Sequence, residues 1–182
     1  MDFLLKLEFW TQVVGFVALV VFLLGYLQKK RSNILLFNLT SRILYIVQYI
    51  MLGAFAGAVL DVAGALATVL AQRKNSPFIK RHLKLVIIAV NLAIIASGVY
   101  VMIAMGDRFG FLPILGVMMH TNAFWLDDEK KIRRLSIIGS PFWLVYNFVS
   151  AAYFSCVGDI LSIVSLGVSM YRYDRKKSNK EG

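Results

Sequence analysis

The sequence predicts an all-α membrane protein with seven transmembrane helices, all within a single domain that covers residues 1–182. Of the 182 residues, 59% are hydrophobic and only 16% are charged, whereas soluble domains have roughly 45–50% apolar and about 25% charged residues. Seven apolar runs, most of them close to the ~20 residues that cross the hydrocarbon core as a helix, alternate with polar segments. Most Lys and Arg residues fall in four of those segments. Composition, run length and charge placement therefore indicate the same fold class.

Each apolar run is expected to be a helix, because lipid offers no hydrogen-bond partner to an unpaired backbone group. The second and third runs join at Gly53, and the sixth and seventh at Ser155. Joins this short predict two tight antiparallel hairpins. The expected spans are residues 9–27, 34–52, 54–72, 83–105, 109–126, 135–153 and 156–173.

The basic residues predict the orientation. Seventeen of the 20 Lys and Arg residues follow the first, third, fifth and seventh spans, and the polar segments on the other side carry only Lys6 and Arg108. Cytoplasmic loops of membrane proteins are enriched in Lys and Arg. The N-terminus is therefore expected outside, and the C-terminus, with a basic tail at 174–182, in the cytoplasm. The formal net charge of +10 then reflects loop placement beside the lipid bilayer and does not indicate a nucleic-acid partner.

The sequence also predicts an internal repeat. The two halves can be aligned with a constant offset of 99, which brings Gln48 onto Asn147 and Gly53 onto Ala152. The chain would then consist of two three-helix units, residues 9–72 and 109–173, joined by a linker helix at 83–105. Parallel repeats of this 3+1+3 kind are a known transporter plan, with the substrate site where the units meet.

Three short motifs carry a resemblance to a known family. They are Leu-Gly-Ala-Phe-Ala-Gly at 52–57, Leu-Pro-Ile-Leu-Gly at 112–116, and Trp143 followed by Tyr146 and Asn147. With the layout, they resemble the YgjV-type bacterial inner membrane proteins over roughly residues 10–175, which implies a multi-pass protein of the bacterial inner (plasma) membrane. That family implies no activity for the chain.

The 3+1+3 layout is more remotely similar to the SWEET sugar facilitators and the PnuC vitamin-precursor transporters. This likeness implies facilitated diffusion of a small polar solute. Thr11-Gln12 and Pro113-Ile114 stand where SWEET proteins have a Pro-Gln pair, so the likeness does not extend to the substrate.

Arg42 is the one basic residue that the loop rule leaves inside a span. Charged groups in a span are costly and usually face a cavity or a partner. By helical rise, Arg42 lies ~12 Å from the cytoplasmic end and Asp61 ~10 Å below the outer surface, so the two could pair if their helices adjoin. His120 is expected ~9 Å from the cytoplasmic end, at the wall of the same cavity. The alternative for Arg42 is that its side chain extends to the cytoplasmic interface.

Amide and aromatic side chains complete the candidate cavity. Trp143 lies one turn from Asn147, Tyr45 is three residues from Gln48, and Asn122 is close to His120. This combination suits a sugar, a nucleoside or a similar ring-bearing solute, and the alternative is hydrogen bonding between helices. Asp159 is expected to be hydrated near the outer surface. Pro141, within a span, is a hinge candidate. The full set of candidate cavity residues is Arg42, Tyr45, Gln48, Asp61, His120, Asn122, Trp143 and Asn147.

The sequence favours a transporter that moves a small polar solute by alternating access between the two units. The alternative is a non-transporting scaffold, accessory subunit or receptor. An enzyme is not expected, because no catalytic constellation stands within the spans. With one cysteine, Cys156, neither a metal site nor another cofactor is expected. The oligomeric state is open between a monomer and a homo-oligomer.

Overall fold

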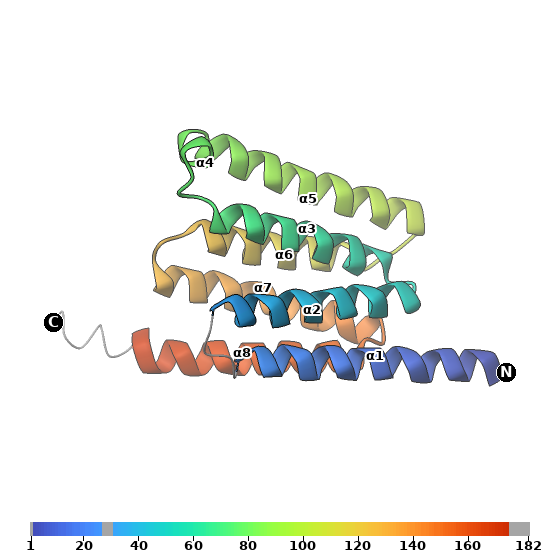
Figure 1. The fold of residues 1–182 in the computed structure, drawn as a ribbon. Coiled ribbons are helices and arrows are strands. Elements are labelled where there is room, and N and C mark those ends of the chain that lie inside the picture. The colour runs from blue at the N-terminus through green and yellow to red at the C-terminus, as the bar shows by residue number, and fades with distance from the viewer. Residues whose placement is uncertain (1, 27–30, 175–182) are drawn as a thin grey trace.

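The computed structural model describes residues 2–26 and 31–174, and every regular element within these residues is a helix. Eight α-helices follow one another along the described residues, and a short π-helical segment, η1 (Met170–Asp174), continues the last of them (Figure 1). The α-helices are α1 (Asp2–Tyr26), α2 (Arg31–Met51), α3 (Phe55–Gln72), α4 (Pro77–Arg81), α5 (Leu83–Met105), α6 (Phe111–Trp125), α7 (Glu129–Val149) and α8 (Tyr153–Ser169).

The seven long helices correspond to the seven predicted spans, and the differences lie at their ends. The bounds of α5 are those predicted, whereas α4 is an additional single-turn helix in a basic segment. Helix α7 begins six residues before the predicted 135, because the Asp128 side chain accepts hydrogen bonds from the backbone N–H groups of Lys130 and Lys131. Such an N-cap satisfies two of the donors that a helix start leaves unpaired. Polar residues can therefore extend a helix beyond its apolar stretch.

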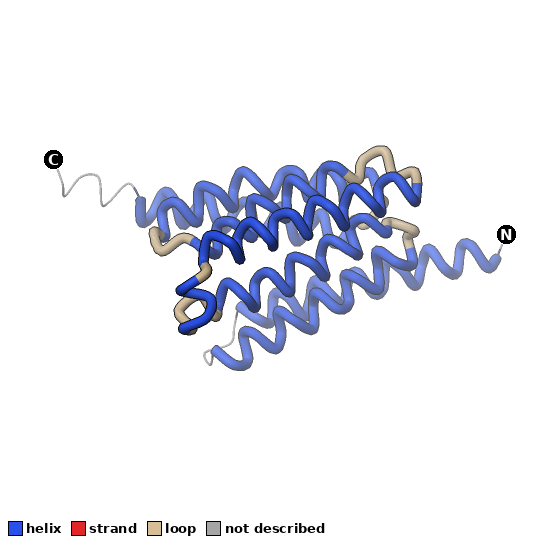
Figure 2. The backbone as a smooth tube through the Cα atoms, turned by 90° about the horizontal axis from the view of Figure 1, so that it is seen from above, coloured by secondary structure: helices blue, strands red, loops and turns tan. Residues whose placement is uncertain are grey.

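The long helices lie side by side in one bundle, and the loops gather at its two ends (Figure 2). Helix α1 packs on α2 and α8, α3 packs on α2, α5 and α6, and α7 packs on α6 and α8. Close approach of α5 to α6 requires Gly98, since a Cβ atom there would lie 2.5 Å from Cγ1 of Ile114. Small residues at helix contacts are typical of membrane bundles.

The two hairpins have the same backbone hydrogen bonds. Ala54 N–H donates to the Tyr49 carbonyl at 2.8 Å, and Ala152 N–H donates to the Asn147 carbonyl at 2.9 Å. The residue with positive φ is Gly53 in the first turn (69°) and Ala151 in the second (57°). Equivalent residues thus differ by 98 in number, and the predicted offset of 99 is wrong by one residue. The predicted join at Ser155 is also wrong, since Ser155 lies inside α8.

By length and composition, three of the described helical segments can cross a membrane: Phe55–Gln72, Leu83–Met105 and Tyr153–Arg172. Within α1, Glu8–Leu24 is a shorter apolar segment. Helix α6 has 15 residues, or ~22 Å of helical rise, and α2 and α7 carry more polar side chains than the others. These three helices supply most of the polar contacts in the centre of the bundle.

Both hairpins, the start of α1 and the α5–α6 connection lie at one end of the bundle, here called the hairpin end (Figure 1). The α3–α5 connection, the α6–α7 connection and η1 lie at the opposite end. The described basic clusters, at 73–84 and 130–134, belong to that opposite end. This separation is the one expected from the loop rule, and the orientation in the membrane stays a prediction.

Candidate functional site

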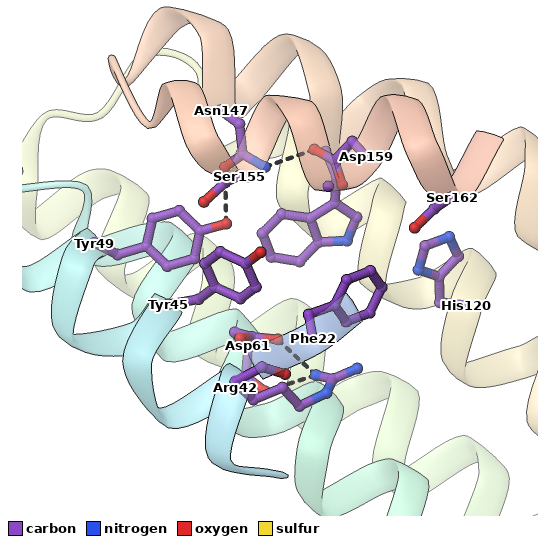
Figure 3. Close-up of a pocket in the computed structure, with 13 residues that line it drawn as sticks. Phe22, Arg42, Tyr45, Tyr49, Asp61, His120, Asn147, Ser155, Asp159 and Ser162 are labelled. Carbon is purple, nitrogen blue, oxygen red and sulfur yellow. Dashed lines mark hydrogen bonds and ion pairs between the residues drawn. The ribbon is translucent and has the colours of Figure 1, made fainter. Parts of the chain in front are cut away.

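A cavity of about 150 Å³ lies in the centre of the bundle. Side chains of α1, α2, α3, α6, α7 and α8 line it, and α5 contributes none (Figure 3). The cavity therefore lies between the first three helices and the last three. Its lining consists of Phe22, Ser41, Arg42, Tyr45, Tyr49, Asp61, His120, Trp143, Asn147, Ser155, Gly158, Asp159 and Ser162.

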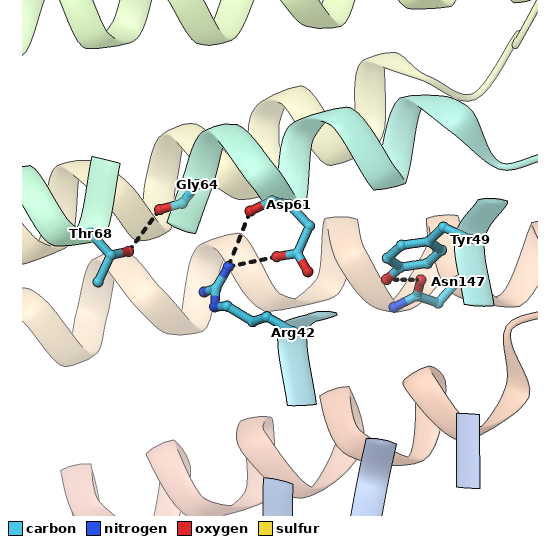
Figure 4. Close-up of polar contacts among 6 residues, drawn as sticks. All are labelled: Arg42, Tyr49, Asp61, Gly64, Thr68 and Asn147. Atoms are coloured by element: carbon cyan, nitrogen blue, oxygen red, sulfur yellow. Dashed lines mark hydrogen bonds and ion pairs between the residues drawn. The ribbon is translucent and has the colours of Figure 1, made fainter. Parts of the chain in front are cut away.

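Arg42 and Asp61 form an ion pair across α2 and α3. Nη1 of Arg42 lies 2.6 Å from Oδ1 of Asp61, and the two side chains are 27% and 14% exposed (Figure 4). The α2–α3 hairpin makes the pair possible, because Arg42 lies ~13 Å from the last residue of α2 and Asp61 lies ~9 Å from the first residue of α3. An arginine side chain is long enough to span the difference between these two heights. The guanidinium is thus directed to a carboxylate at the cavity, which agrees with the predicted pair and disfavours the alternative of an arginine extended to the interface.

A hydrogen-bond chain crosses the cavity wall from α2 to α8. Tyr49 O–H donates to Oδ1 of Asn147 at 2.8 Å, and Nδ2 of Asn147 donates to Oδ2 of Asp159 at 2.7 Å (Figures 3 and 4). A carboxylate only accepts, so the amide nitrogen of Asn147 must face Asp159 and its oxygen must face Tyr49. Asn147 therefore has both ends of its amide committed and positions the carboxylate of Asp159.

His120 joins α6 to α7 at the cavity wall. Its Nε2 lies 3.0 Å from the carbonyl oxygen of Ser136 and 3.3 Å from Oγ of Ser140. Because a carbonyl only accepts, Nε2 carries the proton that binds Ser136. Among the described residues, no group of three or more His, Cys, Asp or Glu side chains could hold a metal ion.

Four aromatic side chains face the cavity: Phe22, Tyr45, Tyr49 and Trp143. Tyr49 and Trp143 stack with ring centroids 6.3 Å apart and an interplanar angle of 25°. Trp143 packs closely against α6 because Gly116 leaves room, since a Cβ atom there would be 2.6 Å from Cδ1 of the indole. The apolar part of the wall is thus aromatic rather than aliphatic.

Two residues predicted for the cavity, Gln48 and Asn122, are not among the residues that line it. Gln48 is fully buried and accepts a hydrogen bond from Ser155 Oγ at 3.0 Å. Asn122 exchanges two side-chain hydrogen bonds with Asn91 of α5, at 3.1 and 2.7 Å. Both amides form hydrogen bonds between helices. This was the alternative role expected for the amide side chains. Successive residues of a helix point about 100° apart, so Tyr49 faces the cavity where Gln48 does not.

Tyr49 lines the cavity although it was not predicted to, and Asp159 lies in the cavity bonded to Asn147 instead of being hydrated near the outer surface as expected. An alignment of the halves with an offset of 98 would have found both. That offset pairs Tyr49 with Asn147, Tyr45 with Trp143 and Asp61 with Asp159, and all six line the cavity. Pro141 lies inside α7 with an exposed side chain, and its role as a hinge stays a prediction.

One family model, Imp-YgjV, described as a bacterial inner membrane protein, matches residues 9–177 of the chain. No curated protein and no solved structure matches the chain significantly. The remote likeness to SWEET and PnuC transporters therefore depends on the layout of the sequence alone.

Proposed function

We propose that this chain, which belongs to the Imp-YgjV family of bacterial inner membrane proteins, transports a small polar solute across the inner membrane. The observation that carries the proposal is the central cavity with its polar lining, to which six of the seven long helices contribute. Polar and charged side chains are rare within a bilayer and usually mark a solute or ion pathway. A scaffold would have no use for an ion pair and a second carboxylate around an open space.

The proposed architecture is two three-helix units, α1–α3 and α6–α8, with α5 as a linker. The matching hydrogen bonds of the two hairpins support this repeat. So do the contacts between units, since α3 packs on α6 as α1 packs on α8. An odd number of spans in the linker gives the two units the same orientation in the membrane, as in transporters with parallel repeats.

In the proposed mechanism, one unit rocks against the other and opens the cavity first to one side and then to the other. The contacts of α1 with α8 and of α3 with α6 would be the ones that change. Pro141 lacks a backbone N–H, and α7 is therefore the helix best suited to bend during this motion. By the distribution of basic residues, the hairpin end would face the periplasm.

Uptake into proteoliposomes is the direct test. A solute is first selected by the rise in thermal stability that it gives the purified protein, since binding to the folded state alone stabilises it. Asn147→Ala is expected to lower its uptake by at least about tenfold, because the change removes a cavity amide and releases Asp159. Asn122→Ala is the matched control, since it removes an amide that joins helices outside the cavity.

Three results can be distinguished. Loss of uptake in Asn147→Ala but not in Asn122→Ala supports the proposal. Equal loss in both variants means that the amides matter only for helix association. Solute binding without uptake by the wild-type protein contradicts transport and favours the receptor alternative.

A further inference from the structure

We propose that the cavity selects a small organic cation, whose ammonium group binds to Asp159 and lies against the aromatic wall. This inference depends on the proposed function in one respect, that the cavity is the solute site. It replaces the sugar or nucleoside class with a charged one, and three independent features of the cavity support it.

The first feature is an asymmetry between the two hairpins. Asp61 and Asp159 are equivalent positions at the offset of 98, and each lies seventh in its helix. The position equivalent to Arg42 is Ser140, whose Oγ donates to the Ser136 carbonyl at 3.0 Å. The first carboxylate therefore has an arginine from its own unit, and the second has a serine that is directed elsewhere.

The consequence is that Asp159 has no cationic partner among the described residues. Among the side chains that the structure describes, no Lys, Arg or His forms an ion pair with Asp159, which accepts a hydrogen bond from Asn147. The cavity lining carries two carboxylates, one guanidinium and an imidazole that needs only its neutral form to bind Ser136. With both carboxylates ionised, its formal charge is −1. A buried charge is costly unless it is paired, so a monovalent cation is the complementary ligand.

The second feature is the aromatic wall. Phe22, Tyr45, Tyr49 and Trp143 surround the same space as Asp159. An ammonium group within about 6 Å of an aromatic face gains about 0.5–2 kcal/mol, most with Trp. Aromatic rings beside one carboxylate form a typical surrounding for alkylammonium ions, and they need no hydrogen-bond donors from the ligand.

The third feature is that several of the polar groups suited to a sugar are already occupied. Both ends of the Asn147 amide are bonded, Arg42 is bound to Asp61, and Ser155 donates to Gln48. A polyol needs several donors and acceptors, and it would find these engaged. The size is also restrictive, because a cavity of about 150 Å³ elsewhere accommodates one benzene ring. A nucleoside exceeds that size.

The test measures binding to purified full-length protein by calorimetry. The probes are choline and tetramethylammonium, and the neutral control is 3,3-dimethylbutan-1-ol, which has the shape of choline without its charge. At least one cation is expected to bind about tenfold or more tightly than the neutral alcohol. Asp159→Asn is expected to remove this preference and leave binding of the alcohol unchanged.

Asp127→Asn is the matched control, because Asp127 is an exposed aspartate that pairs with Lys74 outside the cavity. This variant should keep the preference for the cation. Equal affinity for choline and the neutral alcohol, no binding of either cation, or an unchanged preference in Asp159→Asn would each overturn the inference.

Failure of this inference and failure of the proposed function give different results. Cation binding in detergent without uptake in proteoliposomes leaves the cation site intact and contradicts transport. Uptake of a neutral sugar with no binding of cations leaves transport intact and contradicts the cation site.

Discussion

Asp61 and Asp159 occupy equivalent positions after the two hairpins, yet Asp61 pairs with Arg42 at 2.6 Å while Asp159 is bound by the amide of Asn147. The backbone of the two turns is nearly the same, and the side chains around the two carboxylates are not. Two turns with matching backbone hydrogen bonds thus precede two carboxylates with different partners, and the difference can be tested one residue at a time.

The Arg42–Asp61 pair should stabilise the protein, because without Arg42 the charge of Asp61 would be left unpaired inside the bundle. Arg42→Met is expected to lower the free energy of unfolding by about 2 kcal/mol, less than the ~3–5 kcal/mol of a fully buried pair because both side chains retain some exposure. The double variant Arg42→Met/Asp61→Asn should recover part of the loss, as the remaining charge is also gone. Unfolding in detergent measures both values. Strictly additive effects would mean that Arg42 contacts headgroups rather than Asp61.

The two turns predict a reciprocal pair of substitutions. Ala151 has a φ of 57° and Gly53 a φ of 69°, in the left-handed region that costs a residue with a Cβ atom about 1–2 kcal/mol. Ala151→Gly is therefore expected to raise the unfolding temperature and Gly53→Ala to lower it. No atom lies within 4 Å of a Cβ placed on Gly53, so the second effect comes from the backbone alone. Shifts of the same sign in both variants would contradict this explanation.

Close packing of α5 on α6 predicts a steric effect at Gly98. Gly98→Ala should destabilise the protein by about 1–3 kcal/mol, because the added Cβ atom would lie 2.5 Å from Ile114. Gly167→Ala is the matched control, since nothing lies within 4 Å of a Cβ atom at that position of α8. This control should be neutral or stabilising by up to about 1 kcal/mol, the difference in helix propensity. Thermal unfolding of the two variants in detergent gives the comparison.

The orientation predicts which residues a membrane-impermeant thiol reagent reaches from outside the cell. In a Cys156→Ser background, Arg108→Cys should be labelled in intact cells, because the α5–α6 connection belongs to the hairpin end. Asn75→Cys should be labelled only after the membrane is opened. Both positions are exposed and Cys156 is buried, so access from each side decides the result. The reverse pattern would place the basic end outside.

The membrane class and the number of long helices follow from the sequence by itself. In lipid each span must form all of its backbone hydrogen bonds within one helix, so the length of an apolar run is enough to predict it. The positions of the basic residues likewise predict the orientation in the membrane without knowledge of the fold, because Lys and Arg are enriched in cytoplasmic loops. The bounds of α5 were predicted for this reason, and those of α7 were not, since a side-chain cap at Asp128 extends that helix into polar sequence.

Only the tertiary structure decided which side chains meet. One residue along a helix changes the direction of a side chain by about 100°, so an alignment of the halves that was wrong by one residue selected Gln48 and left out Tyr49. The alignment was wrong because Ala151, and not Ala152, is the counterpart of Gly53. Ala151 adopts the positive φ of a glycine, which an alanine in the sequence does not indicate. Asn122 was expected in the cavity and bonds to Asn91 outside it, whereas Asp159 was expected to be hydrated and lines the cavity. Both differences arise because the partner of a polar side chain depends on which helix packs against its face. The sequence determined that polar groups lie within the long apolar segments, and the packing of α2 against α3 and of α7 against α8 determined which of them share a cavity.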